Sequence, residues 1–270
     1  CIRDRLILLF VFSVLSVPVC HGVISGLYLY GMKIFPGLFI SFILTNILVR
    51  ILQQKNINNP WILVITGLMT GFPNGAYICS WYNKNNPENR LGDMLAGIIN
   101  IPSPAFLISY VYINILEKCI SLPMFLALTY TPVILCSYMA ILFFRDKDNK
   151  KDNAPHIKTG KKLIFHFFEE AVDSSINTAL TLGAYVIIFS VIVNIIMHFS
   201  QSNTAGLLIS YLFEISNGLA IIKNAGIPMN ITVLLTVLLD AFGGVCIIMQ
   251  TKSICSSYIS IKKYIYQKLV

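Results

Sequence analysis

The sequence predicts an all-α polytopic membrane protein, as its composition and three long uncharged runs indicate. Hydrophobic residues make up 56% of the 270-residue chain and charged residues 12%, about half the charged fraction of an ordinary soluble domain. Residues 6–32, 120–144 and 174–213 contain no Asp, Glu, Lys or Arg. A helix of roughly 20 apolar residues crosses the hydrocarbon core, so each run can hold at least one transmembrane helix.

Apolar runs and helix-breaking residues define the expected elements of the first half. A helix over about 6–22 leads into the half-polar stretch GLYLYGMK (26–33), which should separate it from a second helix. Gly, Pro and Asn interrupt the next two apolar segments. The remaining elements are a helix near 34–52, interrupted segments over 61–82 and 88–116, and an uninterrupted helix over about 120–144.

The second half follows a strongly basic segment, 145–162, which we expect to be a solvated cytoplasmic linker. Glu169, Glu170 and Asp173 recur at helical spacing. This pattern predicts an amphipathic helix on the membrane surface at the start of the second half. The elements after it are a helix over about 178–199, interrupted segments over 205–224 and 228–251, and a tail too polar to span.

The interruptions occur as two matched pairs. GFPNGAYI (71–78) aligns with EISNGLAI (214–221) through an Asn-Gly pair, and later breaks occur at NIPSPAF (100–106) and DAFGGVC (240–246). Irregular backbone at membrane depth costs several kcal/mol for each unsatisfied peptide group unless it faces protein or a wet cavity. A simple proline kink accounts for one such break. Two matched pairs instead predict two repeats, each with a re-entrant hairpin and a broken transmembrane helix.

The distribution of positive charge orients these repeats. With the N-terminus inside and one hairpin entering from each face, all lysines and arginines except Lys33, Lys118 and Lys223 lie on the cytoplasmic side. If every interrupted segment spanned fully, the basic linker would lie outside. The halves are therefore expected to be inverted repeats, an arrangement common among secondary transporters. The expected parts are an N-terminal helix and surface stretch (1–33), a first repeat (34–144), the linker (145–162) and a second repeat (163–270). Whether the second repeat lacks a final helix stays open.

Polar residues beside the breaks are the candidate binding residues. Ionisable groups at membrane depth are expensive and usually face a cavity or a partner, which singles out Glu214 before ISNG and Asp240 before FGG. For Asp240, a helix position near the membrane interface stays the structural alternative. The neutral donors and acceptors beside the breaks are Asn74, Asn100, Ser103, Ser216, Asn217 and Gln250.

Several functional classes find no support in the sequence. Motifs of the HExxH, GxSxG and P-loop kinds are absent, so we do not expect an enzyme. The seven cysteines form no CxxC pair and the four histidines have no metal-ligand spacing, so we expect neither a cofactor nor a metal site. A coupling Na⁺ or H⁺ stays open. The net charge of +8 comes from basic residues at segment ends, which favours topology signals over nucleic-acid binding.

Six stretches of the chain carry a family resemblance. They are IFPGLFISFIL (34–44), GFPNGAYI (71–78), IPSPAF (101–106), TLGAYVIIFSVI (181–192), EISNGL (214–219) and FGGVCIIMQ (242–250). In this order they resemble the motifs of YlbJ-type sporulation integral membrane proteins, which carry two nucleoside-recognition (Gate) domains. The resemblance covers about 34–251 and adds Gly75, Gly243 and Gly244 to the implied binding residues.

The resemblance implies a function and a location. It implies a transporter that moves a small polar or anionic metabolite during sporulation, plausibly dipicolinic acid into the forespore, by alternating access. The implied fold is a core like that of concentrative nucleoside transporters in a bacterial cell membrane, such as the mother-cell-derived outer forespore membrane. The implied partners are the lipid bilayer and a small-molecule substrate, and homo-oligomerisation stays open. The alternatives are an ion-coupled nucleoside transporter and a non-transporting membrane scaffold for spore assembly.

Overall fold

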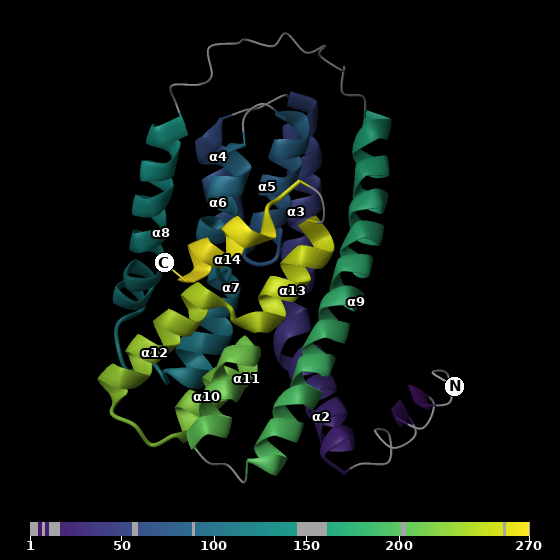
Figure 1. The fold of residues 1–270 in the computed structure, drawn as a ribbon. Coiled ribbons are helices and arrows are strands. Elements are labelled where there is room, and N and C mark those ends of the chain that lie inside the picture. The colour runs from purple at the N-terminus through teal and green to yellow at the C-terminus, as the bar shows by residue number, and fades with distance from the viewer. Residues whose placement is uncertain are drawn as a thin grey trace.

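The computed structural model describes residues 5–6, 9–10, 17–55, 59–87, 90–144, 161–200, 204–255 and 258–269, and within these ranges every regular element is a helix (Figure 1). Five helical stretches are long and apolar enough to cross a membrane. They are Val17–Leu48, Leu91–Ile115, Leu122–Phe143, Phe168–Phe199 and Met229–Cys255. This architecture is consistent with the predicted all-α polytopic membrane protein.

The first long helix is continuous where the sequence predicted a separation. Helix α2 (Val17–Tyr28), the π-helical turn η1 (Leu29–Ile34) and α3 (Phe35–Lys55) follow one another without a loop. The prediction of separate helices over 6–22 and 34–52 is therefore wrong for the described part, and Lys33 lies within η1 rather than in an external loop. Most of residues 6–16 lie outside the described residues.

The glycines of this stretch serve helix packing. A Cβ at Gly22 would lie 2.5 Å from the Cα of Val191, and one at Gly26 would lie 2.9 Å from the Cα of Ile187. Their four-residue spacing places both on one face of α2, where small residues let two membrane helices approach closely. Glycine in this segment therefore marks the contact with the long helix α9, and it does not end the helix.

Helix α9 is likewise longer than predicted. It runs from Lys161 to Phe199 as 39 residues, about 58 Å at the α-helical rise. The expected surface helix before residue 178 is therefore wrong, because its residues continue the spanning helix. Glu169 and Asp173 are exposed on one side, while the buried Ser175 accepts a hydrogen bond from Asn46 Nδ2 of α3 at 3.0 Å. Packing against α3 keeps this part of α9 in line with the rest of the helix.

The four predicted interruptions are confirmed as places where helices end. The short helices around them are α4 (Pro60–Thr70), α5 (Asn74–Asn85), α6 (Leu91–Ile99), α7 (Pro104–Phe106) with the π-helical η2 (Leu107–Ile115), α10 (Thr204–Phe213), α11 (Ile215–Asn224), α12 (Met229–Phe242) and α13 (Gly244–Cys255). The uninterrupted α8 (Leu122–Phe144) matches its prediction. Figure 1 shows α4 and α5 near the end of the bundle where α8 ends and α9 begins, and α10 and α11 at the opposite end.

Close backbone packing joins the turn between α4 and α5 to the break between α6 and α7. Phe72 N donates to Ile101 O at 3.0 Å. A Cβ at Gly71 would collide with the backbone nitrogen of Ser103, and one at Gly75 would lie 2.9 Å from Ile99 O. Gly71 also has a φ of 71° and a ψ of −173°, a region that is essentially restricted to glycine.

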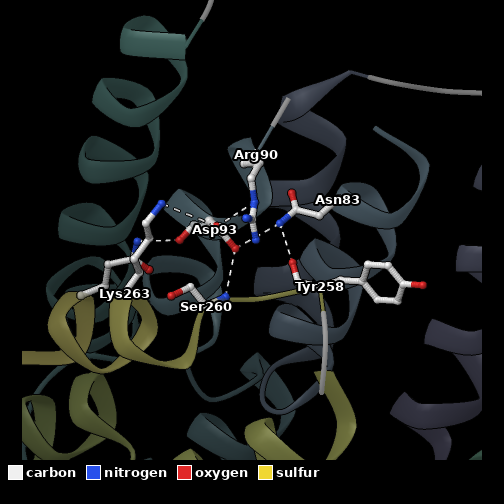
Figure 2. Close-up of polar contacts among 7 residues, drawn as sticks. Asn83, Arg90, Asp93, Tyr258, Ser260 and Lys263 are labelled. Atoms are coloured by element: carbon white, nitrogen blue, oxygen red, sulfur yellow. Dashed lines mark hydrogen bonds and ion pairs between the residues drawn. The ribbon is translucent and has the colours of Figure 1, made fainter. Parts of the chain in front are cut away.

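The last helix, α14 (Ile261–Leu269), lies beside α6. Figure 2 shows the polar cluster that anchors its first turn around Asp93, whose side chain is 1% exposed. Asp93 Oδ2 lies 3.1 Å from Arg90 Nε and 3.6 Å from Lys263 Nζ. Its Oδ1 accepts hydrogen bonds from Ser260 N at 3.1 Å and from Asn83 Nδ2 at 3.2 Å. One buried carboxylate therefore ties the C-terminal segment to the first half.

The Gly71→Ala substitution tests the backbone contact. The added methyl group meets Ser103 in a glycine-only conformation, and the strain of about 1–3 kcal/mol should lower the thermal unfolding midpoint in detergent. Gly37→Ala is the matched control, because a Cβ there meets nothing within 4 Å, and its midpoint should stay unchanged or rise. Equal midpoints for the two variants would contradict the packing described above.

The Asp93→Asn substitution tests the anchor of α14. Arg90 and Lys263 are about half exposed, so the loss should amount to about 1–3 kcal/mol of unfolding free energy. Hydrogen exchange of residues 260–268 should accelerate. Lys263→Ala removes only one of the two half-exposed partners and should accelerate exchange much less. Exchange that stays slow in Asp93→Asn would show that α14 is held by its other contacts.

Candidate functional site at the helix breaks

Glu214 occupies the break between α10 and α11 with its side chain buried. The residue is 2% exposed, and its Oε2 accepts a hydrogen bond from Asn217 N at 2.7 Å. This is an N-cap, which satisfies one of the unpaired N–H groups at the start of α11. A negative charge there also interacts favourably with the positive end of the helix dipole. The fold therefore offers a specific position for a buried carboxylate.

A small, partly open cavity lies beside this cap, and we call it the central cavity. Its volume is about 20 Å³, which is room for about one water molecule. The residues that line it are Tyr30, Ile34, Leu38, Phe72, Phe106, Leu182, Val186, Glu214, Ile215, Ser216, Ile247 and Gln250. The wall is mostly apolar, with polar groups supplied chiefly by the second half of the chain.

Two polar atoms on this wall lack partners. Ser216 Oγ and Gln250 Oε1 are buried without a hydrogen-bond partner among the described residues. The Gln250 amide nitrogen donates to Cys246 Sγ at 3.1 Å, a weak acceptor. Unsatisfied buried polar groups carry a desolvation cost. A polar ligand or a water molecule that hydrogen-bonds to these two atoms would therefore stabilise the folded protein.

The cavity is lined by residues of the turn between α4 and α5, of the break before α11, and of α7 and α13, the helices that follow the other two breaks. Phe72 belongs to the turn between α4 and α5, and Phe106 follows the break after α6. Tyr110 of η2 donates its hydroxyl to Ser216 O at 3.2 Å. A Cβ at Gly244 would lie 3.2 Å from Phe213 O, so the break after α12 approaches the turn before α11. Of the predicted binding residues, Glu214, Ser216 and Gln250 line this one cavity.

The candidates of the first half lie elsewhere and have structural partners. Asn100 Oδ1 accepts a hydrogen bond from Ala76 N at 3.2 Å, and Ser103 Oγ caps α7 by accepting from Phe106 N at 3.3 Å. Asn74 begins α5 and is 5% exposed, next to Gly75 and its close contact with Ile99. None of Asn74, Gly75, Asn100 and Ser103 lines the central cavity.

Asn217 faces a different cavity from Glu214. This second cavity has a volume of about 300 Å³ and is lined by Val193, Met197, Leu207, Asn217, Ala220, Ile221, Asn224 and Ala225. Asn217 Nδ2 donates to Ser190 Oγ of α9 at 3.1 Å. The Asn-Gly pairs that aligned in the sequence thus differ in surroundings, and Asn217 does not join the central group.

Asp240 is fully buried in α12. Both of its carboxylate oxygens lack a hydrogen-bond partner among the described residues, as does Oγ1 of Thr236 one turn earlier. The break that follows is made by Gly243 and Gly244, whose φ angles are 81° and 83°. Glycine adopts such angles without a Cβ clash. Asp240 is thus a buried carboxylate near a break, as predicted, but it does not line the central cavity.

Two buried polar side chains beside the helix breaks were missed by sequence reasoning. Tyr264 and Lys268 of α14 are buried, although the tail was expected to be polar and cytoplasmic. Tyr264 OH accepts a hydrogen bond from Asn100 Nδ2 at 2.7 Å. The four-residue spacing of Tyr264 and Lys268 is the signal that places them on one helix face.

Comparison with known proteins adds no assignment, since no family model, curated protein or solved structure matches the chain. Within the ranges that the structure describes, no group of three or more His, Cys, Asp or Glu residues is arranged to hold a metal ion.

The Glu214→Ala substitution tests the cap. The amide of Asn217 loses its acceptor, which should cost about 0.5–2 kcal/mol and accelerate hydrogen exchange over residues 215–218. Glu214→Gln keeps a side-chain oxygen acceptor, so it should lose less stability and show a smaller acceleration of exchange. Equal acceleration in both variants would mean that the charge matters and the cap geometry does not.

Proposed function

We propose that the protein is a membrane carrier for a small polar or anionic metabolite and works by alternating access. The observation that carries this proposal is the central cavity, where Glu214 at the break before α11 is buried beside Ser216 Oγ and Gln250 Oε1, two oxygen atoms without a hydrogen-bond partner among the described residues. Ionisable and unsatisfied polar groups at membrane depth are expensive. A ligand that hydrogen-bonds to them offsets that cost.

The arrangement of the short helices supports an inverted repeat. Each half has one long helix, then a pair of short helices, then a broken helix. The pairs α4–α5 and α10–α11 lie toward opposite ends of the bundle in Figure 1. Read as re-entrant hairpins, they would open the central cavity from opposite faces of the membrane, while the long helices α2–α3 and α9 form the scaffold.

The chemistry of the cavity fits a planar polar ligand. Phe72 and Phe106 supply aromatic surface, and Ser216 and Gln250 supply hydrogen-bonding groups. Dipicolinic acid, the substrate that the sequence resemblance implies, is aromatic and carries two carboxyl groups. Glu214 would repel its dianion, so this substrate requires a protonated Glu214. The cavity of about 20 Å³ must also widen before such a ligand enters.

Uptake into proteoliposomes tests the proposal. Purified protein should show saturable dipicolinate uptake, and Glu214→Leu or Gln250→Leu should reduce it about tenfold or more, because each removes a buried polar contact worth about 1.5 kcal/mol. Ser137→Ala is the matched control, since Ser137 Oγ is also buried and unpartnered but lies on α8 away from the cavity.

Competition identifies the substrate class. If uridine or adenosine displaces a labelled substrate and dipicolinate does not, the ion-coupled nucleoside transporter is the correct alternative. Absence of saturable flux for both classes, in protein that is folded by thermal unfolding, would instead favour a non-transporting scaffold.

A further inference from the structure

Helix α14 is bound along one face of α6. Gln267 Nε2 donates to Asp93 O and Gln267 Oε1 accepts from Gly97 N, both at 2.8 Å. One turn further along α6, Asn100 Nδ2 donates to Tyr264 OH at 2.7 Å. The spacing of Asp93, Gly97 and Asn100 puts all three on one face of α6. These contacts bring the end of α14 to the place where α6 breaks.

The side chain of Lys268 ends between two helix breaks. Lys268 is 8% exposed, and its Nζ donates to Asn100 O at 2.5 Å and to Ala241 O at 2.9 Å. Asn100 directly follows α6, and Ala241 lies in the last turn of α12. Among the described residues the structure pairs this ammonium with no carboxylate. The nearest acid in sequence to its partners, Asp240, has no hydrogen-bond partner itself.

Two opposing effects act on the charge of Lys268. Burial lowers the pKa of its ammonium group to about 7, because removal from water disfavours the charged form, whereas the two helix ends beside it favour a positive charge. The C-terminal end of a helix carries roughly half a negative elementary charge, concentrated on its unpaired carbonyl groups. Two such ends, those of α6 and α12, converge on Lys268 Nζ. Their sum is about one negative charge, which one ammonium group balances. Burial of an unpaired lysine is otherwise strongly unfavourable.

We propose that the space between Asn100 O and Ala241 O is a site for a monovalent cation that the chain fills with the ammonium group of Lys268. Carbonyl groups at the C-terminal ends of half-helices are ligands that coordinate Na⁺ in broken-helix membrane proteins. Here the cation is covalently attached and enters with α14. The closed arrangement of the two broken helices therefore requires no alkali ion.

This inference goes beyond the proposed transport function, because it concerns what stabilises the folded protein. Its test measures thermal unfolding of the full chain in detergent, in choline chloride and in NaCl, KCl or LiCl at equal ionic strength. Failure of the flux experiment leaves this result unaffected, and the reverse also holds.

Three variants distinguish the loss of the charge, the filling of the space by an uncharged group, and the general effect of removing a lysine from α14. Lys268→Ala empties the site, so its unfolding midpoint should fall by several degrees in choline chloride and recover saturably as an alkali cation is added. Lys268→Met fills the same space with an apolar group, so its unfolding midpoint should fall and should not recover when an alkali cation is added. Lys262→Ala, an exposed lysine of the same helix, should match the wild type, which should not respond to the cation.

The outcomes decide the proposal. Recovery confined to Lys268→Ala supports it. A midpoint of Lys268→Ala equal to that of the wild type, a fall that no alkali cation reverses, or an equal recovery in Lys268→Met would overturn it. If Lys268→Ala folds in neither salt, Lys268→Ser, which also leaves the space open, replaces it in the same comparison.

Discussion

The satisfaction of peptide groups at interrupted helices is the constraint on which this structure depends. Each break within the bundle leaves N–H and C=O groups without intrahelical partners, and lipid offers none. Specific side chains supply the missing hydrogen bonds. Glu214 and Ser103 accept hydrogen bonds at the starts of α11 and α7, while Lys268 donates to carbonyls at the ends of α6 and α12.

Close backbone approach is the second part of the same solution. Gly71 and Gly75 let the turn between α4 and α5 contact the break after α6, and Gly244 lets the break after α12 contact the turn before α11. A side chain at these positions would separate the breaks and expose their peptide groups. The glycines and the capping side chains therefore act together to satisfy the backbone at the breaks.

The sequence predicted where helices break better than it predicted where they continue without interruption. Gly, Pro and Asn within apolar runs correctly indicated all four interruptions, since these residues disfavour helix interiors. The half-polar stretch 26–33 was wrongly predicted to separate two helices, because the sequence alone contains no information about the α9 backbone that packs against Gly22 and Gly26. Lys268 was missed for a similar reason. Its carbonyl partner Asn100 is 168 residues away in the chain, and no local pattern encodes that contact.

The two halves differ in how completely their breaks are satisfied. In the first half, Asn100 and Ser103 both have hydrogen-bond partners. In the second half, Ser216, Asp240 and Gln250 retain buried oxygen atoms without partners among the described residues. Unsatisfied groups raise the free energy of the folded structure. A ligand or a rearrangement that supplies the missing hydrogen bonds would therefore stabilise the second half more than the first. If the proposed transport function is correct, α11, α12 and α13, which carry these oxygen atoms, are therefore the elements that a bound ligand would affect most.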